Sequence, residues 1–235
     1  MAELVSRTPA SALAVYAHPD DPEVSCGGTL ARWAADGCRV DVVICTSGDK
    51  GSSDPDVDPA ELSRRRAGEV AEAGRTLGVA DHHLLGHPDG ELYDERQLVH
   101  EIVCLVRRVR PEVVVCPDPT SVFFGEHYFN HRDHRTVGWA TLDAVSPAAA
   151  QPHYFPEAGP AHQVATVYLS GAMTPDVWVD VSSSIDAKIA ALMCHASQLA
   201  EPGEWLRGVV AQRAEEAGRQ AGVAFAEGFR RLKLA

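Results

Sequence analysis

Two short clusters of histidine and aspartate contain the residues of this sequence that are best suited to chemistry. The first cluster, AHPDD at residues 17–21, holds one imidazole, His18, and two adjacent carboxylates, Asp20 and Asp21. Two neighbouring carboxylates repel each other unless a cation or a proton lies between them. A divalent metal ion is such a cation, and an imidazole is a good nitrogen ligand for it. The cluster is therefore a candidate metal site, although Pro and Asp are also common in solvated turns.

The second cluster, HRDH at residues 131–134, adds His131, Asp133 and His134. Its two histidines are three residues apart, so they share a face on a helical turn. Two imidazoles and one carboxylate around a divalent ion with an open position are the composition of a catalytic zinc site. The metal would activate water and polarise a carbonyl, and a carboxylate left free of the metal could accept the proton of that water. A second histidine, held by an aspartate, could stabilise the oxyanion and protonate a leaving amine. The two clusters together predict metal-assisted hydrolysis of an amide.

The elements around the clusters predict how they meet. Apolar runs predict strands, and amphipathic patterns between them predict helices, in the order β-α-β-α-β-α-β within residues 13–116. This alternation predicts a Rossmann-like, three-layer α/β fold with a mainly parallel sheet and helices on both faces. AHPDD follows the first strand and HRDH follows the loop after the fourth. Because carboxyl ends of parallel strands lie at one edge of the sheet, both clusters are expected in one cleft.

The remainder of the chain is predicted with fewer constraints. We expect a single domain over residues 1–235, with a loose leader at 1–10. The expected elements are helices at 29–36, 61–77, 98–108, 136–145 and 185–198, and strands at 164–169 and 177–181 joined as a hairpin. A long C-terminal helix is expected at 204–232 within 200–235, with Gly222 as a candidate break. The loop at 117–130 and the proline-rich stretch at 146–161 are expected to shape the pocket. The C-terminal helix could pack on the core, cover the site or join subunits, so a homo-oligomer is possible.

Charge and composition exclude several classes of partner. The net charge of −12 and the pI of about 5.3 argue against nucleic acid and against an anionic membrane surface as partners. No apolar run approaches the length of a membrane span. The six cysteines form no CxxC pair and are typical of a reducing cytosol. We expect no cleaved signal peptide, because cleavage would remove the first strand, and therefore expect a cytoplasmic protein.

Five motifs in a fixed order add a family resemblance. AHPDD is followed by CGGTLA, then GDKGS, GHPDGEL and NHRDHR. The sequence from about residue 12 to residue 200 resembles the LmbE/PIG-L family of N-acetylglucosaminyl deacetylases. The resemblance implies a Rossmann-like fold, a zinc ion, and removal of acetyl groups from small molecules that contain N-acetylglucosamine.

The same resemblance implies a role for individual residues, carried over by position. The implied metal ligands are His18, Asp21 and His134. Asp20 is implied as the general base, and His131 as the electrophilic or acidic group, oriented by Asp133. Arg66 and Asp89 are implied to hold sugar hydroxyls or a neighbouring group. Some family members assist catalysis with a tyrosine two residues before the first histidine of HxDH, where this chain has Phe129.

Other functions are compatible with the same residues. Two histidines and one carboxylate also describe the facial triad of a non-haem Fe(II) oxygenase, so Fe²⁺ is an alternative metal. The chain could also hydrolyse another amide, or bind a metal or a sugar without catalysis. The free carboxylate of Asp20 and the pairing of His131 with Asp133 favour hydrolysis, because hydrolysis requires proton transfer.

Overall fold

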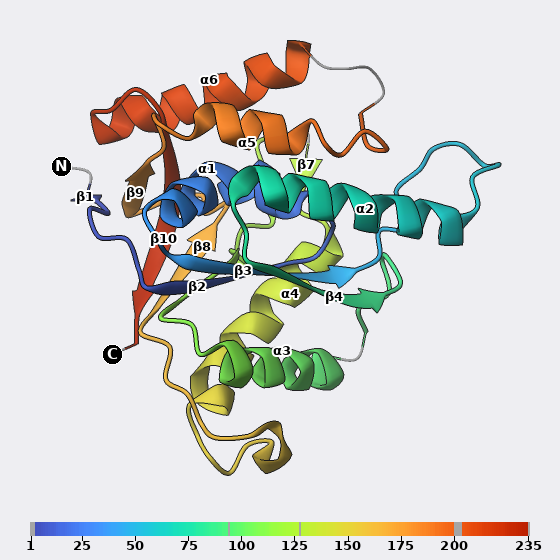
Figure 1. Ribbon diagram of the computed structural model, residues 1–235, viewed down its shortest axis with the longest axis vertical. Helices are drawn as coiled ribbons and strands as arrows, with labels where there is room; N and C mark the ends of the chain where they lie inside the picture. Colours follow the sequence, from blue (N-terminus) through green and yellow to red (C-terminus); the bar gives the residue numbers. More distant parts are fainter. Residues whose placement is uncertain (1–2, 94, 127, 200–203, 235) are drawn as a thin grey trace.

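A computed structural model describes residues 3–93, 95–126, 128–199 and 204–234 of the chain. Its central feature is an eight-stranded sheet with the strand order β1-β9-β10-β8-β5-β2-β3-β4 (Figure 1). The strands of this sheet are β1 (Glu3–Leu4), β2 (Ser11–Tyr16), β3 (Arg39–Thr46), β4 (Asp81–His87), β5 (Val113–Pro117), β8 (Thr166–Ser170), β9 (Val177–Asp180) and β10 (Ala226–Lys233). A separate two-stranded hairpin joins β6 (Phe123–Phe124) to β7 (Tyr128–Phe129).

Helices cover both faces of the sheet, which confirms the predicted α/β fold. The helices are α1 (Asp21–Ala35), α2 (Pro59–Leu77), α3 (Glu95–Val109), α4 (Arg132–Asp143), α5 (Ile185–Leu192) and α6 (Glu204–Ala221), with short irregular turns at Ala144–Ala149 and Pro156–Ala158. Figure 1 shows α3 and α4 on one face, and α1, α2, α5 and α6 on the other. The side chains of strand β2 show why helices must cover both faces of the sheet. Leu13 and Val15 pack in the cluster that contains α3 and α4, whereas Ala14 and Tyr16 pack against α1.

The order of the central strands creates a crevice beside β2. Strand β2 pairs in parallel with β3 on one side and with β5 on the other. The chain therefore runs outward through β3 and β4, and then returns across β2 to form β5. The loop after β2 and the loop after β5 therefore lead to opposite sides of the sheet, which leaves a crevice between them at the carboxyl ends of these strands. Ligands of open α/β sheets bind in such crevices. The AHPDD cluster follows β2, and HRDH follows the loop after β5, so both lie at this crevice.

Helix α1 begins earlier than predicted and contains a break. Residues 29–36 were expected as the helix, but α1 starts at Asp21, and Cys26 has a non-helical φ of −146°. The carboxylate of Glu227 accepts hydrogen bonds from the backbone N–H groups of Gly28 and Thr29, at 3.1 and 2.7 Å. Glu227 thus satisfies the N–H groups that the break leaves free, and the predicted helix corresponds to the segment after the break. A Cβ at Gly28 would lie 2.9 Å from Cβ of Val181, so the close packing requires glycine there.

The prediction of a helix over residues 204–232 is wrong in its second half. Helix α6 ends at Ala221, Gly222 has a positive φ of 76°, and β10 inserts antiparallel between β8 and β9. The predicted hairpin between the strands at 164–169 and 177–181 is therefore also wrong. The amphipathic pattern of the segment is compatible with a helix locally, but burial of Ala226 and Phe229 in the sheet decides its structure.

Two further segments are held by contacts that the sequence did not predict. A loose leader was predicted at residues 1–10, of which residues 1–2 lie outside the described residues; within 3–10, β1 pairs in parallel with β9. Residues 148–159 are held against α3 by the buried guanidinium of Arg107, which donates hydrogen bonds to six backbone carbonyls of that segment. Among the described residues, no helix combines the length and the apolar character needed to cross a lipid bilayer.

Candidate metal centre and active site

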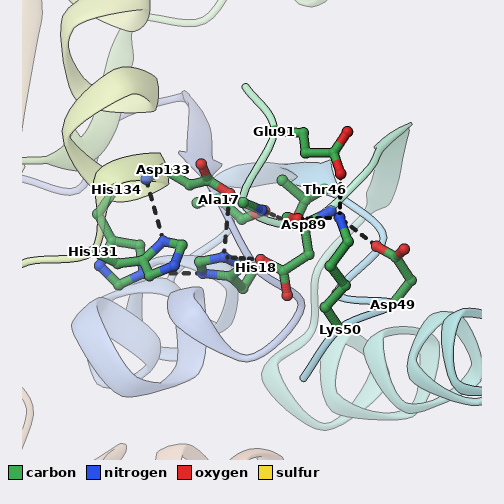
Figure 2. A network of polar contacts seen from close by, with 12 residues as sticks. Ala17, His18, Thr46, Asp49, Lys50, Asp89, Glu91, His131, Asp133 and His134 are labelled. Atoms are coloured by element: carbon green, nitrogen blue, oxygen red, sulfur yellow. Dashed lines mark hydrogen bonds and ion pairs between the residues drawn. The ribbon is translucent and has the colours of Figure 1, made fainter. Parts of the chain in front are cut away.

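Three side chains from the two predicted clusters bring a donor atom each to one point (Figure 2 shows the two histidines). Nδ1 of His18 lies 3.0 Å from Nε2 of His134, and that nitrogen lies 3.1 Å from Oδ1 of Asp21. The other oxygen of Asp21 is 3.4 Å from Nδ1 of His18. Bonds of about 2.0–2.1 Å to a tetrahedral zinc ion place neighbouring ligand atoms about 3.3–3.4 Å apart. The three donors therefore fit a divalent metal ion, with small movements, and leave a coordination position open.

Both histidines are oriented by the ring nitrogen that faces away from this point. Nε2 of His18 lies 3.0 Å from Oδ1 of Asp89, and Nδ1 of His134 lies 2.9 Å from Oδ1 of Asn130. Because a carboxylate oxygen and an amide oxygen only accept, each outer nitrogen carries a proton. In the neutral ring the inner nitrogen is then available to bind a metal ion. This is the arrangement that metal-bound histidines commonly have.

Asn130 was not predicted as a site residue. Its amide nitrogen donates to the backbone carbonyl of Ser121, at 2.9 Å, which orients its oxygen toward His134. The sequence contained one signal for this role, because Asn130 precedes His134 by four residues in NHRDHR.

A second set of donors shares His18 with the first. His18, His131 and Asp133 also bring one donor atom each within metal-binding range. Asp133 lies 3.6 Å from Nε2 of His18, and this nitrogen already contacts Asp89. The first set requires no change of partner at His18, which makes it the stronger candidate for the metal site.

The electrostatics of the site favour a bound cation. Burial lowers the pKa of His18, but the hydrogen bonds that its ring donates to the carboxylates of Asp133, Asp21 and Asp89 outweigh burial and raise the pKa to about 12. Burial raises the pKa of Asp21, but the two histidines outweigh it and hold that pKa far below its ordinary value. Three carboxylates around one imidazole are an excess of negative charge, which either a proton or a metal ion can balance.

Asp20 lies beside this centre and is paired with Arg66. Nη2 of Arg66 donates to Oδ1 of Asp20 at 2.9 Å, and Nη1 donates to the carbonyl of Gly48 at 3.1 Å. The side chain of Arg66 is 3% exposed, whereas that of Asp20 is 27% exposed. The resemblance implied that Arg66 holds sugar hydroxyls or a neighbouring group, and in the structure Arg66 holds the neighbouring carboxylate of Asp20. The buried guanidinium restricts the orientation of the Asp20 carboxylate.

His131 begins α4 and faces the other two histidines. Its Nδ1 accepts a hydrogen bond from the backbone N–H of Asp133, so the neutral ring carries its proton on Nε2. Its ring centroid lies 4.9 Å from that of His18, and burial together with the charge of His18 lowers the pKa of His131. The Asp133 carboxylate accepts from the backbone N–H of Gly90 at 2.7 Å. The structure thus shows Asp133 holding His131 through its backbone rather than through its carboxylate.

A cavity of about 740 Å³ extends from Asp21 and His134 toward α6 and β10. The loop at 117–130 contributes Asp118 and the rings of Phe124 and Tyr128, as predicted for that loop. Residues 146–161 do not line this cavity, so their predicted contribution to the pocket is wrong. The far end carries the paired charges of Lys188 and Glu227, and Arg213 of α6 lies on the wall.

Comparison with known proteins places the chain in a family. The family model for GlcNAc-PI de-N-acetylase, called PIG-L, matches residues 13–145, and this range includes both clusters. Diacetylchitobiose deacetylase from Thermococcus kodakarensis is 32% identical over 223 residues, which cover 93% of this chain and 81% of the relative. The chain belongs to the PIG-L family.

Other PIG-L relatives extend this result. The 1D-myo-inositol 2-acetamido-2-deoxy-alpha-D-glucopyranoside deacetylase of Streptomyces avermitilis is 34% identical over 190 residues, covering 69% of this chain and 62% of that protein. The crystal structure of N,N'-diacetylchitobiose deacetylase from Pyrococcus horikoshii superposes with a TM-score of 0.87 at 26% identity, and covers 96% of this chain and 84% of that one. This PIG-L protein therefore has relatives that deacetylate different sugar-containing molecules.

Proposed function

We propose that this PIG-L protein is a zinc-dependent N-deacetylase of an N-acetylglucosamine-type sugar within a small metabolite. The observation that carries the proposal is the triangle of His18 Nδ1, His134 Nε2 and the Asp21 carboxylate, with sides of 3.0–3.4 Å. His18, Asp21 and His134 would hold the metal. A cytoplasmic location is part of the proposal, and it is supported by the six cysteines, all of which have free thiols.

The other residues of the site supply the proton transfers that amide hydrolysis needs. When bound, the metal would lower the pKa of a water molecule and polarise the substrate carbonyl. Asp20 accepts the proton of the attacking water, and the hydrogen bond from Arg66 holds its carboxylate in place. His131 directs its Nε2–H toward the carbonyl oxygen and stabilises the negative charge that develops there. The leaving amine takes up one proton when the C–N bond breaks. This is the proton that Asp20 accepted from the water, so Asp20 returns to its carboxylate form.

We propose that the cavity beside the metal receives the second ring of a glycoside. An acetyl group needs only a small part of about 740 Å³. The lining combines two aromatic rings with the charged groups of Lys188, Glu227 and Asp118. The charged group of Arg213 in this lining is exposed. An alkyl chain would remove that group from water without replacing its hydrogen bonds, whereas a ring bearing hydroxyls can replace them. The second ring is thus favoured over a long acyl chain.

Tyr128→Ala tests this assignment of the cavity. Loss of the ring should raise KM for an N-acetylated disaccharide by about 3–10-fold, the usual size of one aromatic contact, and leave KM for the N-acetylated monosaccharide unchanged. Steady-state assays of both substrates measure the split. Phe123→Ala is the matched control, because Phe123 lies on the same hairpin, is 71% exposed and does not line the cavity. Equal changes for both substrates, or a preference for longer N-acyl chains, would contradict the assignment.

Acetate release decides the reaction class. We would assay N-acetylglucosamine and its glycosides with metal-stripped protein, and with the same protein after zinc or Fe²⁺ is restored. Zinc-restored release of acetate is the expected result. Oxygen consumption that depends on Fe²⁺, without acetate release, would instead favour an oxygenase. Stoichiometric zinc with no turnover of any substrate would indicate another amide or a binding protein.

A further inference from the structure

We infer that Asp49 and Lys50 are positioning residues for the metal ligand His18, and that they act on it through Asp89. The inference rests on the proposed metal site, but it concerns residues to which neither the family motifs nor the predicted ligand set gave a role. Both residues belong to the GDKGS motif, which lies in the loop after β3.

Side chains from other segments hold the turn that contains Asp89 through hydrogen bonds to three of its backbone polar groups (Figure 2). Oδ1 of Asp49 accepts a hydrogen bond from the backbone N–H of Asp89 at 2.8 Å. Nζ of Lys50 donates to the backbone carbonyl of Asp89 at 2.5 Å. The Asp133 carboxylate accepts from the next backbone N–H, that of Gly90, at 2.7 Å. Gly90 has a positive φ of 76°, a conformation that glycine adopts without strain, so the turn itself is permissive and the three contacts define its place.

The side chain of the tethered residue reaches the metal site directly. Oδ1 of Asp89 lies 3.0 Å from Nε2 of His18, and it is the acceptor that keeps the proton on this nitrogen. Movement of the turn would therefore loosen the ring of His18 and release Nδ1 from its fixed direction. Hydrogen-bond partners of metal-binding histidines contribute strongly to metal affinity, because they hold the ring in its metal-binding orientation.

The sheet places the two motifs where these contacts can form. Strands β3 and β4 are parallel neighbours, and the backbone N–H of Ser47 donates to the carbonyl of His87 where the two strands end. The loops that follow, with Asp49 and Lys50 in one and Asp89 in the other, therefore start side by side. Lys50 also pairs with Glu91, so its ammonium group spans the outer side of the turn. The described contacts of Lys50 are thus directed to the turn and not to the open face of the cavity.

Zinc affinity tests the inference without relying on catalysis. Asp49→Ala should weaken zinc binding by about 10-fold or more in competition with a chelator, in line with other outer partners of metal-bound histidines. Asp49→Asn keeps an acceptor oxygen for the Asp89 N–H and should recover most of the affinity. The visible spectrum of the cobalt-substituted protein should change in Asp49→Ala and not in Asp49→Asn. Asp56→Ala, at an exposed site of the same loop, is the matched control.

A second pair of variants tests the inference even if Asp49→Ala does not fold. Lys50 is 47% exposed at its side chain, so Lys50→Ala should fold, and it should also weaken zinc binding, whereas Lys50→Arg keeps a donor and should not. Zinc affinity within twofold of wild type in both alanine variants would overturn the inference. Failure of the wild-type protein itself to bind zinc would instead refute the proposed metal site, so the two failures are distinguishable.

Discussion

Replacing Asp20 with asparagine is expected to lower kcat by about 100-fold or more, while the protein still binds one zinc ion. Asparagine has nearly the same shape, and its amide oxygen can still accept the hydrogen bond that Arg66 donates to Asp20. The amide cannot take up the proton of the attacking water, so the loss should fall on turnover and not on metal content. Steady-state kinetics and metal analysis of the same preparation measure both quantities.

The Asp20 experiment has a control on the same helix. Asp36 is an exposed aspartate at the other end of α1, and Asp36→Asn should leave kcat unchanged. Turnover of Asp20→Asn within a few-fold of the wild-type value would remove Asp20 from the mechanism. Loss of zinc from this variant would show that the carboxylate serves the metal instead.

The second large effect is expected for His134→Ala, which should lose stoichiometric zinc and, with it, all zinc-dependent turnover. This substitution removes one of the three donor atoms, whereas outer partners alone are worth about 10–100-fold in affinity. The substitution also leaves Asn130 and Asp21 without their contacts to the ring. Zinc content after dialysis, and affinity by chelator competition, measure the loss.

His131→Ala distinguishes the two possible sets of donors. His131 lies one turn before His134 and belongs only to the set that includes Asp133. We expect His131→Ala to keep one zinc ion and to lose turnover, because its ring stabilises the negative charge that develops on the carbonyl oxygen. If His131→Ala loses zinc while His134→Ala retains it, the metal lies in the second set and the ligand assignment is wrong.

The sequence by itself determined the parallel half of the fold and the meeting of the two clusters. Strands such as β2 and β3 are buried on both faces, so their apolar runs are visible without any knowledge of neighbours. AHPDD and HRDH are short runs of consecutive residues, so they too can be identified from the local sequence. Because parallel strands end at a common edge, alternation of strands and helices was enough to bring His18 and His134 together.

Only the tertiary structure decided the hydrogen-bond partner of each side chain in the site. The resemblance implied that Arg66 and Asp89 hold sugar hydroxyls or a neighbouring group, and the structure shows which groups they contact: Arg66 donates to Asp20, and Asp89 contacts His18. Those partners are separated by 46 and 71 residues, and no local pattern encodes such a pairing. The same holds for β10, whose residues are amphipathic enough for a helix and become a strand because β8 and β9 leave a place between them. Local preference is a weak constraint at such positions, and burial against partners far away in the sequence outweighs it.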